Sequence, residues 1–153
     1  MPMMNVHIPY GAYWSTPFTR WQGALASLHS VELAARVATN VLGRKKIPAT
    51  AFDGIALGMT VPQHRAFYGA PWLAGMIGAG EIGGPTLSQA CATSARLLAH
   101  AALEVASGQK HCVLAIACDR TSNGPHIYYP DPQGPGGRGT AEDWVWDNFN
   151  HDP

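Results

Sequence analysis

The chain has 153 residues, of which 46% are hydrophobic, enough for one domain with its own core and against a disordered chain. Ten Lys and Arg residues balance ten Asp and Glu residues, so the charge shows neither the basic surface of a nucleic-acid-binding protein nor an acidic tail. Only 13% of the residues are charged, against about a quarter in an average soluble domain. We therefore expect further polypeptide or another subunit to cover part of the surface.

The cysteines and histidines argue against disulfide-rich and metal-binding classes. Cys91, Cys112 and Cys118 are odd in number and contain no C-x-x-C pair, which favours a reducing compartment. The seven histidines form no H-E-x-x-H pattern, so we expect no metal. The sequence shows neither a signal peptide nor a run of about 18 apolar residues, so we expect a cytoplasmic protein without a membrane span.

In chain order, residues 5–10 are predicted to form a short strand and residues 11–21 a loop. Apolar residues that recur every four positions then predict an amphipathic helix, with Ser30 as its N-cap and Gly43 as its end. Pro48 is expected to begin a short helical turn.

The middle of the chain predicts two strands around a helix. Residues 55–61 have the length and apolar content of a strand buried on both faces, and residues 66–77 are predicted to be helical. Residues 78–83 match G-x-G-x-x-G, but a predicted helix precedes them and a strand follows at residues 86–89. A dinucleotide site needs the opposite order, so we interpret the glycines as a connection.

The next elements complete an α/β pattern. Residues 92–107 are apolar almost all round and predict a buried helix, and residues 111–118 predict a central strand. Residues 124–139 are rich in Pro and Gly and predict a loop. The apolar tail from residue 141 is expected to continue into further polypeptide.

Cys91 is the candidate nucleophile because it follows a strand and opens the predicted buried helix. The N–H groups and positive end of a helix favour a thiolate, and they can also bind the oxyanion formed from a thioester carbonyl. A buried structural cysteine is the other interpretation that this position leaves open. Cys112 and Cys118 are predicted to be small buried hydrophobic side chains.

Several segments resemble the thiolases. The stretch S-Q-A-C-A-T-S-A at residues 88–95 is similar to the N-x-x-C-x-S-G segment that carries the family's nucleophilic cysteine. The strand that ends in D-R-T-S at residues 119–122 is similar to one that ends in G-G-x-E-S-M-S, and residues 16–25 resemble the early R-T-P-x-G…G-x-L segment. The resemblance extends from residue 5 to about residue 123. Ser88 replaces the usual Asn and Asp119 the usual Glu, which suggests a divergent branch.

The resemblance implies an α/β fold, the first half of a layered αβαβα thiolase fold. It implies a mixed sheet and a buried helix after Cys91. Residues 1–123 would form the N-terminal half-domain, and residues 124–153 would begin the inserted loop domain. The family's base histidine and second cysteine belong to the other half.

The implied function is that of an acyl-CoA C-acyltransferase. Cys91 would attack a 3-oxoacyl-CoA with its backbone N–H as oxyanion donor, form an acyl-Cys91 thioester and pass the acyl group to CoA, or run the reverse Claisen condensation. Coenzyme A and acyl-CoA would be substrates, and no cofactor would be bound permanently. The implied partners are a C-terminal thiolase half, in the same or a separate chain, and further copies in a homo- or hetero-oligomer, with residues 85–89 near a dimer centre.

Two other functions remain open at this stage. A β-ketoacyl-synthase-like condensing enzyme would have a similar cysteine segment but would not cleave 3-oxoacyl-CoA with free CoA. A non-catalytic thiolase-like interaction or scaffold subunit would agree with Ser88 and with the loss of the glycine pair at Ile116 and Ala117. Neither a nucleic acid nor a membrane is an expected partner.

Overall fold

The computed structural model describes residues 5–131, 133 and 139–149. Helices and strands alternate over most of this range, as the sequence predicts. The elements are α1 (Ser30–Lys45), the 3-10 helix η1 (Ala49–Ala51), β1 (Gly54–Gly58), α2 (Gly69–Met76), β2 (Thr86–Leu87), the 3-10 helix η2 (Ala90–Ala92), α3 (Thr93–Ala106), β3 (Val113–Ala117), β4 (His126–Tyr129), β5 (Thr140–Asp143) and α4 (Trp144–Phe149). Among them, no helix is long and apolar enough to cross a bilayer.

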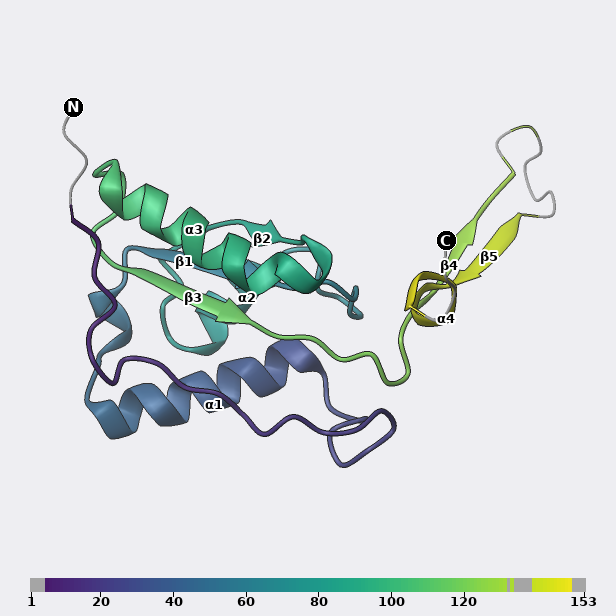
Figure 1. Ribbon diagram of the computed structural model, residues 1–153, viewed down its shortest axis with the longest axis horizontal. Coiled ribbons are helices and arrows are strands. Elements are labelled where there is room, and N and C mark those ends of the chain that lie inside the picture. Colours follow the sequence, from purple (N-terminus) through teal and green to yellow (C-terminus); the bar gives the residue numbers. More distant parts are fainter. Residues whose placement is uncertain (1–4, 132, 134–138, 150–153) are drawn as a thin grey trace.

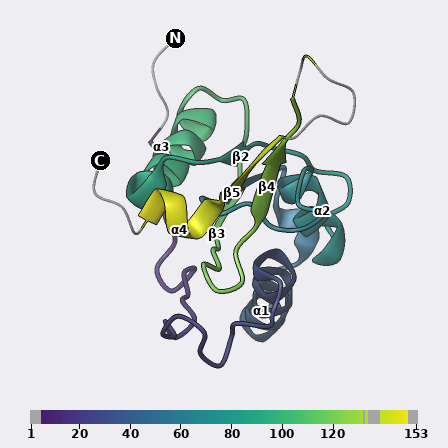
Figure 2. The ribbon, with the colours of Figure 1, turned by 90° about the vertical axis from the view of Figure 1, so that its right-hand side faces the viewer.

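The main sheet has three strands in the order β2-β1-β3, and both strand pairs are parallel. The mixed sheet that the resemblance implies is thus a parallel sheet within the described residues. Helix α3 covers one face of the sheet, and α1 and α2 cover the other (Figures 1 and 2). The result is an α/β arrangement in three layers, as expected.

The two faces of β1 carry side chains of different size. Ile55 and Leu57 join the apolar cluster beneath α1 and α2. On the opposite face, a Cβ added at Gly58 would lie 3.0 Å from Thr93 Cγ2 and 3.3 Å from Leu97 Cδ2 of α3. Because that face lacks large side chains, α3 packs close to the sheet, and its first residues lie near the carboxyl end of β1.

Helix α1 is amphipathic, as predicted, but both of its ends differ from the prediction. The N-cap is His29, whose Nδ1 accepts a hydrogen bond from the Val31 N–H, and Ser30 is the first helical residue. The helix passes through Gly43 and ends where Lys46 adopts a left-handed conformation with φ 55°. An imidazole therefore caps the helix in place of the expected hydroxyl.

Replacing His29 with alanine is expected to destabilise the fold by about 1–2 kcal/mol, since it removes the cap and an edge-to-face ring contact. The His29 Nε2 also lies 2.7 Å from the His64 carbonyl oxygen, and the ring centroid lies 5.1 Å from that of Trp72. Urea unfolding of His29→Ala measures the loss. His64→Ala is the matched control, because His64 takes part in this contact only through its backbone. Equal losses in the two variants would contradict the capping role.

The predicted strand at residues 5–10 is not present. These residues are exposed and pair with none of the strands that the structure describes. Strand β3, predicted to be central, is instead at the edge of the described sheet, so its outer hydrogen-bonding groups have no neighbouring strand there. An apolar segment becomes a strand only when a neighbour supplies hydrogen bonds, and none of the described strands does so for residues 5–10.

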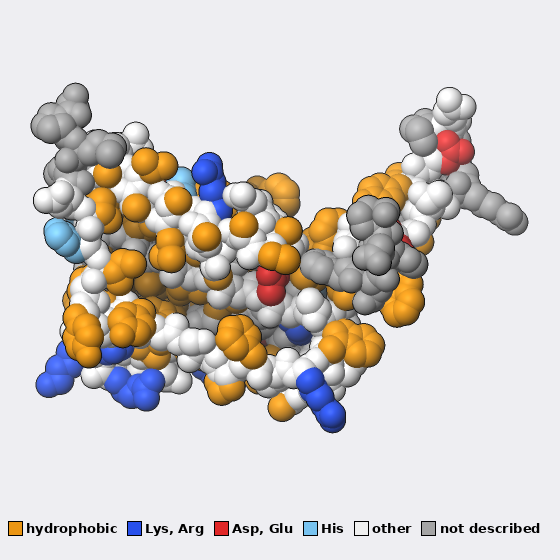
Figure 3. Space-filling view, viewed as in Figure 1, with side chains coloured by type: hydrophobic (Ala, Val, Ile, Leu, Met, Phe, Trp, Pro, Cys, Tyr) orange, Lys and Arg blue, Asp and Glu red, His pale blue; other side chains and the backbone are white. Residues whose placement is uncertain are grey.

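The helix after Cys91, predicted to be buried almost all round, is buried on one face within the described residues. Only Thr93, Leu97 and Ala106 of α3 are buried, whereas Leu98 is 51% exposed and Leu103 is 57% exposed. Figure 3 shows hydrophobic side chains spread over this side of the molecule, on α3 and on the N-terminal segment. The helix packs with one face on the sheet and leaves an apolar face uncovered.

Of the predictions for the two connecting segments, the one after α2 agrees with the structure and the one after β3 agrees only in part. The glycines at residues 78–83 join α2 to the segment before β2, as predicted. The loop predicted for residues 124–139 is wrong at its start, because β4 pairs antiparallel with β5, and α4 follows. These three elements form an arm that projects from the end of β3 (Figure 1).

Candidate functional site

Three strand ends meet at one edge of the sheet. Because β1, β2 and β3 are parallel, their carboxyl ends point the same way, toward the side from which the arm leaves (Figure 1). Thr60 follows β1, Cys91 follows β2 and Asp119 follows β3. In α/β proteins, ligand sites lie preferentially beyond the carboxyl ends of parallel strands.

Cys91 is the middle residue of η2, the short turn between β2 and α3, and its side chain is exposed. Helix α3 begins two residues later, at Thr93. Ala90, just before the cysteine, has φ 46°, a left-handed conformation that is uncommon for a residue with a Cβ. The turn therefore presents the thiol to solvent at the start of α3, in a backbone conformation that its surroundings must stabilise.

Two threonine hydroxyls hold this turn. Thr93 Oγ1 donates to the Ala90 carbonyl oxygen at 2.7 Å and accepts from the Gln89 N–H at 2.8 Å. Thr60 Oγ1 lies 3.1 Å from Thr93 Oγ1 and 3.3 Å from the same carbonyl oxygen. Thr93 is only 5% exposed, so its hydroxyl is satisfied inside the protein by these partners.

Asp119 ties the end of β3 to the end of β1. Its carboxylate accepts the Thr60 N–H at 3.0 Å and the Val61 N–H at 2.8 Å. The backbone of β3 adds a further link, because the Cys118 N–H donates to the Gly58 carbonyl at 2.9 Å. The hydrogen bonds thus run continuously from β3 through Thr60 to the turn that carries Cys91.

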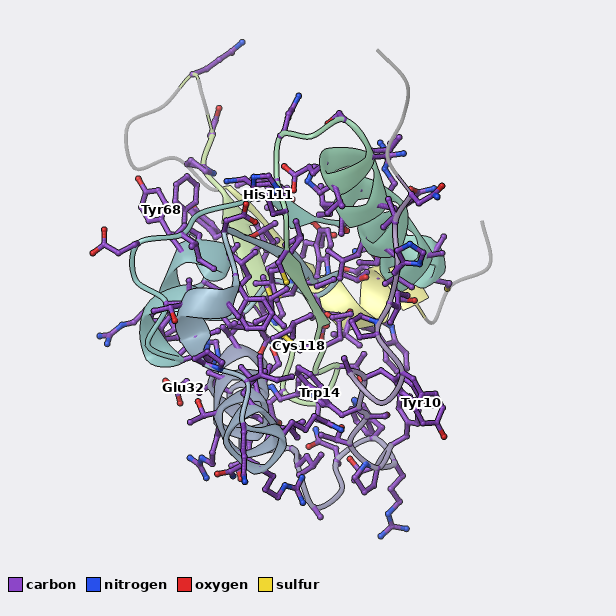
Figure 4. The ribbon with its side chains drawn as sticks, turned by 90° about the vertical axis from the view of Figure 1, so that its left-hand side faces the viewer. Tyr10, Trp14, Glu32, Tyr68, His111 and Cys118 are labelled. Carbon is purple, nitrogen blue, oxygen red and sulfur yellow. The ribbon has the colours of Figure 1, made fainter. Side chains whose placement is uncertain are left out.

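The other two cysteines flank β3 and differ from each other. Cys112 is exposed, so its predicted burial is wrong. Partial desolvation of its sulfur, together with the charge of Asp53, raises the pKa of its thiol. Cys118 is partly buried against the core near Trp14 (Figure 4), and burial raises the pKa of its thiol from 9.0 to about 12. Neither cysteine lies with Cys91 at the turn before α3.

Cys91 lines neither of two hollows found in the described part of the chain. The larger, of about 430 Å³, lies between the N-terminal segment, α1 and the end of β3. Trp14, Phe18 and Leu33 line it, together with Ser94 and Asp119. The Cys91 side chain is exposed and lines neither of these two hollows.

Sequence reasoning placed Cys91 at the turn and the structure agrees, but it missed the hydroxyls around it. Thr93 is a polar residue at the start of an otherwise apolar helix, and Thr60 is a polar residue at the end of an apolar strand. A hydroxyl at each of these positions was the available signal. The left-handed Ala90 left no signal, because alanine is not a residue type that favours that conformation.

Comparisons with known proteins agree on one family. A family model described as the N-terminal domain of thiolase matches residues 12–143. The acetyl-CoA acetyltransferase of Yarrowia lipolytica is 25% identical over 165 residues, which cover 99% of this chain and 39% of that protein. The chain thus spans about two fifths of the length of this relative.

Solved structures of thiolases have the same fold as this chain. The acetyl-CoA acetyltransferase of Bacillus anthracis superposes with a TM-score of 0.71 at 23% identity, over 83% of this chain and 33% of that one. Human mitochondrial 3-ketoacyl-CoA thiolase superposes with a TM-score of 0.77 at 20% identity, over 88% of this chain and 35% of that one. The complex of that thiolase with CoA superposes with a TM-score of 0.76 at 19% identity, again over 88% of this chain and 35% of that one. Since the family model covers most of the chain and the parallel sheet matches these folds, the chain belongs to the thiolase family.

Proposed function

We propose that this chain supplies the nucleophile of a thiolase-type acyl transferase, and that the nucleophile is Cys91. The observation that carries the proposal is an exposed cysteine in a tight turn at the start of α3, beyond the carboxyl ends of three parallel strands, in a chain of the thiolase family. A thiolate at this position is accessible to a thioester substrate and lies next to the N–H groups of a helix start.

The reaction that fits this site is cleavage of a 3-oxoacyl-CoA. The Cys91 thiolate adds to the C3 carbonyl carbon, and the resulting oxyanion accepts a hydrogen bond from the Cys91 backbone N–H. The C2–C3 bond then breaks, its electron pair goes to C2, and C2 takes a proton to release acetyl-CoA or a substituted relative. The acyl group remains on Cys91 as a thioester. The thiol of a second CoA attacks that thioester, loses its proton and releases acyl-CoA and the Cys91 thiolate.

The reverse direction uses the same bonds. Cys91 accepts an acetyl group from acetyl-CoA, and the C2 carbanion of a second acyl-CoA attacks the thioester carbon in a Claisen condensation. Because one thioester replaces another, the acyl transfer to sulfur has a small free-energy change, which suits a cysteine nucleophile in a reversible reaction. Acyl-CoA and CoA are substrates in both directions, and no resident cofactor is needed.

The proton transfers in this scheme need an acid–base group beside Cys91. We infer that a C-terminal thiolase half, in the same or a separate polypeptide, supplies it and covers the exposed apolar face of α3. This agrees with the coverage of 39% of the acetyl-CoA acetyltransferase. In this proposal, residues 1–123 are the first half-domain, residues 124–153 begin the inserted loop domain, and the complete units form an oligomer in the cytoplasm.

The proposal is tested by trapping the intermediate in the intact protein, together with its C-terminal half. After brief incubation with acetyl-CoA and an acid quench, mass spectrometry should find an acetyl group on the peptide that carries Cys91. Cys91→Ser should carry no label and should lower turnover by at least about a thousandfold. Cys112→Ser is the matched control and should label normally. An unlabelled Cys91, or full turnover by Cys91→Ser, would show that Cys91 is not the nucleophile.

A further inference from the structure

The turn that carries Cys91 has a backbone conformation that its own residues do not favour. Ala90 has φ 46°, and a residue with a Cβ adopts this region at a cost in energy that glycine avoids. The flanking Gln89 has φ −148° and ψ 46°, so both residues before the cysteine have irregular backbone angles. Something outside the turn must hold it in place.

The Ala90 carbonyl oxygen is where the surroundings hold the turn. It receives the Thr93 hydroxyl at 2.7 Å and has the Thr60 hydroxyl at 3.3 Å, while the Thr93 N–H bonds to it as well. Thr93 Oγ1 also accepts the Gln89 N–H at 2.8 Å, so a single hydroxyl bonds to both residues before the cysteine. Each hydroxyl has a partner for its proton. The Thr93 hydroxyl donates to the Ala90 carbonyl oxygen and accepts from the Gln89 N–H, and the Thr60 hydroxyl can donate to Thr93 Oγ1 or to the Ala90 carbonyl oxygen.

Thr60 is fixed from the opposite side. The Asp119 carboxylate accepts its N–H at 3.0 Å and that of Val61 at 2.8 Å. The absence of a Cβ at Gly58 leaves room for Thr93, since an added Cβ would lie 3.0 Å from Thr93 Cγ2. Thr93 is therefore confined by packing on one side and by hydrogen bonds on the other.

We propose that Thr93 is a positioning residue for Cys91, supported by Thr60 and through it by Asp119. The inference rests on the proposed function for its catalytic meaning. Its physical content is that the Thr93 hydroxyl keeps Ala90 left-handed and so fixes the direction of the neighbouring thiol. A displacement of a reacting group by about 1 Å lowers a rate by about a hundredfold, so a hydroxyl that never touches the substrate controls the reaction.

The decisive variant is Thr93→Val, which keeps the shape of the side chain and removes its hydroxyl. In the intact protein we expect two rates to fall by about tenfold or more: acylation of Cys91 by acetyl-CoA and alkylation of Cys91 by iodoacetamide. The KM for acyl-CoA should stay within about twofold of the wild type. Thr93→Ser, which keeps the hydroxyl, should restore most of the rate. Adding Ala90→Gly to Thr93→Val should also recover rate, because glycine adopts the left-handed conformation without the hydroxyl.

The matched control is Thr39→Val in α1, which removes a threonine hydroxyl that donates to the Ala35 carbonyl at 2.9 Å, in a helix that does not contribute to the turn. It should leave both rates unchanged. If Thr93→Val fails to fold, Thr60→Val provides the same test from the neighbouring strand and should slow acylation in the same direction.

The outcomes separate the inference from the function on which it rests. A wild-type protein that acylates at Cys91 and a Thr93→Val protein that acylates equally fast would overturn the inference and leave the function intact. A loss of thermal stability in Thr93→Val with unchanged acylation and alkylation rates would show a purely structural role and would also overturn it. Failure of the wild type to acylate would overturn the function, and the alkylation rates would still decide whether Thr93 positions the thiol.

Discussion

Replacing Gly84 with alanine is expected to lower the free energy of unfolding by at least about 3 kcal/mol. Gly84 lies in the segment that pairs with β1, where the Leu57 N–H donates to the Pro85 carbonyl oxygen at 3.0 Å. A Cβ added at Gly84 would overlap the carbonyl oxygen of Ile55, a backbone atom in the fully buried strand β1. Neither atom can rotate away, so the strands must separate. Urea unfolding followed by circular dichroism measures the change.

The matched control is Gly83→Ala, the same substitution one residue earlier. A Cβ at Gly83 meets nothing within 4 Å, and its φ is not in the left-handed range. Its free energy of unfolding should stay within about 1 kcal/mol of the wild type. Equal losses in the two variants would mean that the register between β1 and the segment before β2 is not the one described.

Elements with a strong local pattern were predictable from the sequence. Helix α1 follows from apolar residues at helical spacing, and β1 from a short apolar run that is buried on both faces, which the structure confirms for all five residues. The position of Cys91 between β2 and α3 also follows from local signals. Each of these predictions depends only on residues within a few positions of one another.

Elements whose state depends on distant neighbours were not predictable. Within the described residues, segment 5–10 has the composition of a strand but no partner to pair with, and β3 is an edge strand. The apolar residues on both sides of α3 predicted burial, yet one face remains exposed. In both cases the sequence reports what a segment can bury or pair, and the described residues lack the neighbour that would do so.

In the arm the error is the opposite one: the composition predicted a loop where the structure has a strand. Proline and glycine around residues 130–139 predicted a loop, whereas Ile127, Tyr128 and Tyr129 have high strand propensity and pair with β5. The loop prediction for residues 124–139 extended over β4, and residues 132 and 134–138 of that segment lie outside the described residues. A hairpin would have been predicted if the aromatic residues had been considered apart from the proline-rich segment that follows them.

Alkylation by iodoacetamide is expected to rank the three cysteines, with Cys91 fastest and Cys118 slowest. Burial raises the pKa of Cys118 from 9.0 to about 12, so its thiolate is about a thousandfold scarcer at neutral pH than that of an ordinary cysteine. The more basic thiolate is intrinsically about twentyfold more nucleophilic, which leaves Cys118 about fiftyfold slower before steric shielding is counted. Cys112 also has a raised pKa but is exposed, so it should react at an intermediate rate in the folded protein.

Peptide mass spectrometry over a time course at pH 7 measures the three rates in one sample. Raising the pH should increase the Cys118 rate about tenfold per unit until the pH approaches 12, because its thiolate fraction grows over that whole range. In urea all three cysteines should react at similar rates, which serves as the control for peptide detection. Prior incubation with acetyl-CoA should protect Cys91 alone, since the acyl group would occupy its sulfur. Equal rates for Cys91 and Cys118 in the folded protein would contradict both the burial of the end of β3 and the exposure of the turn before α3.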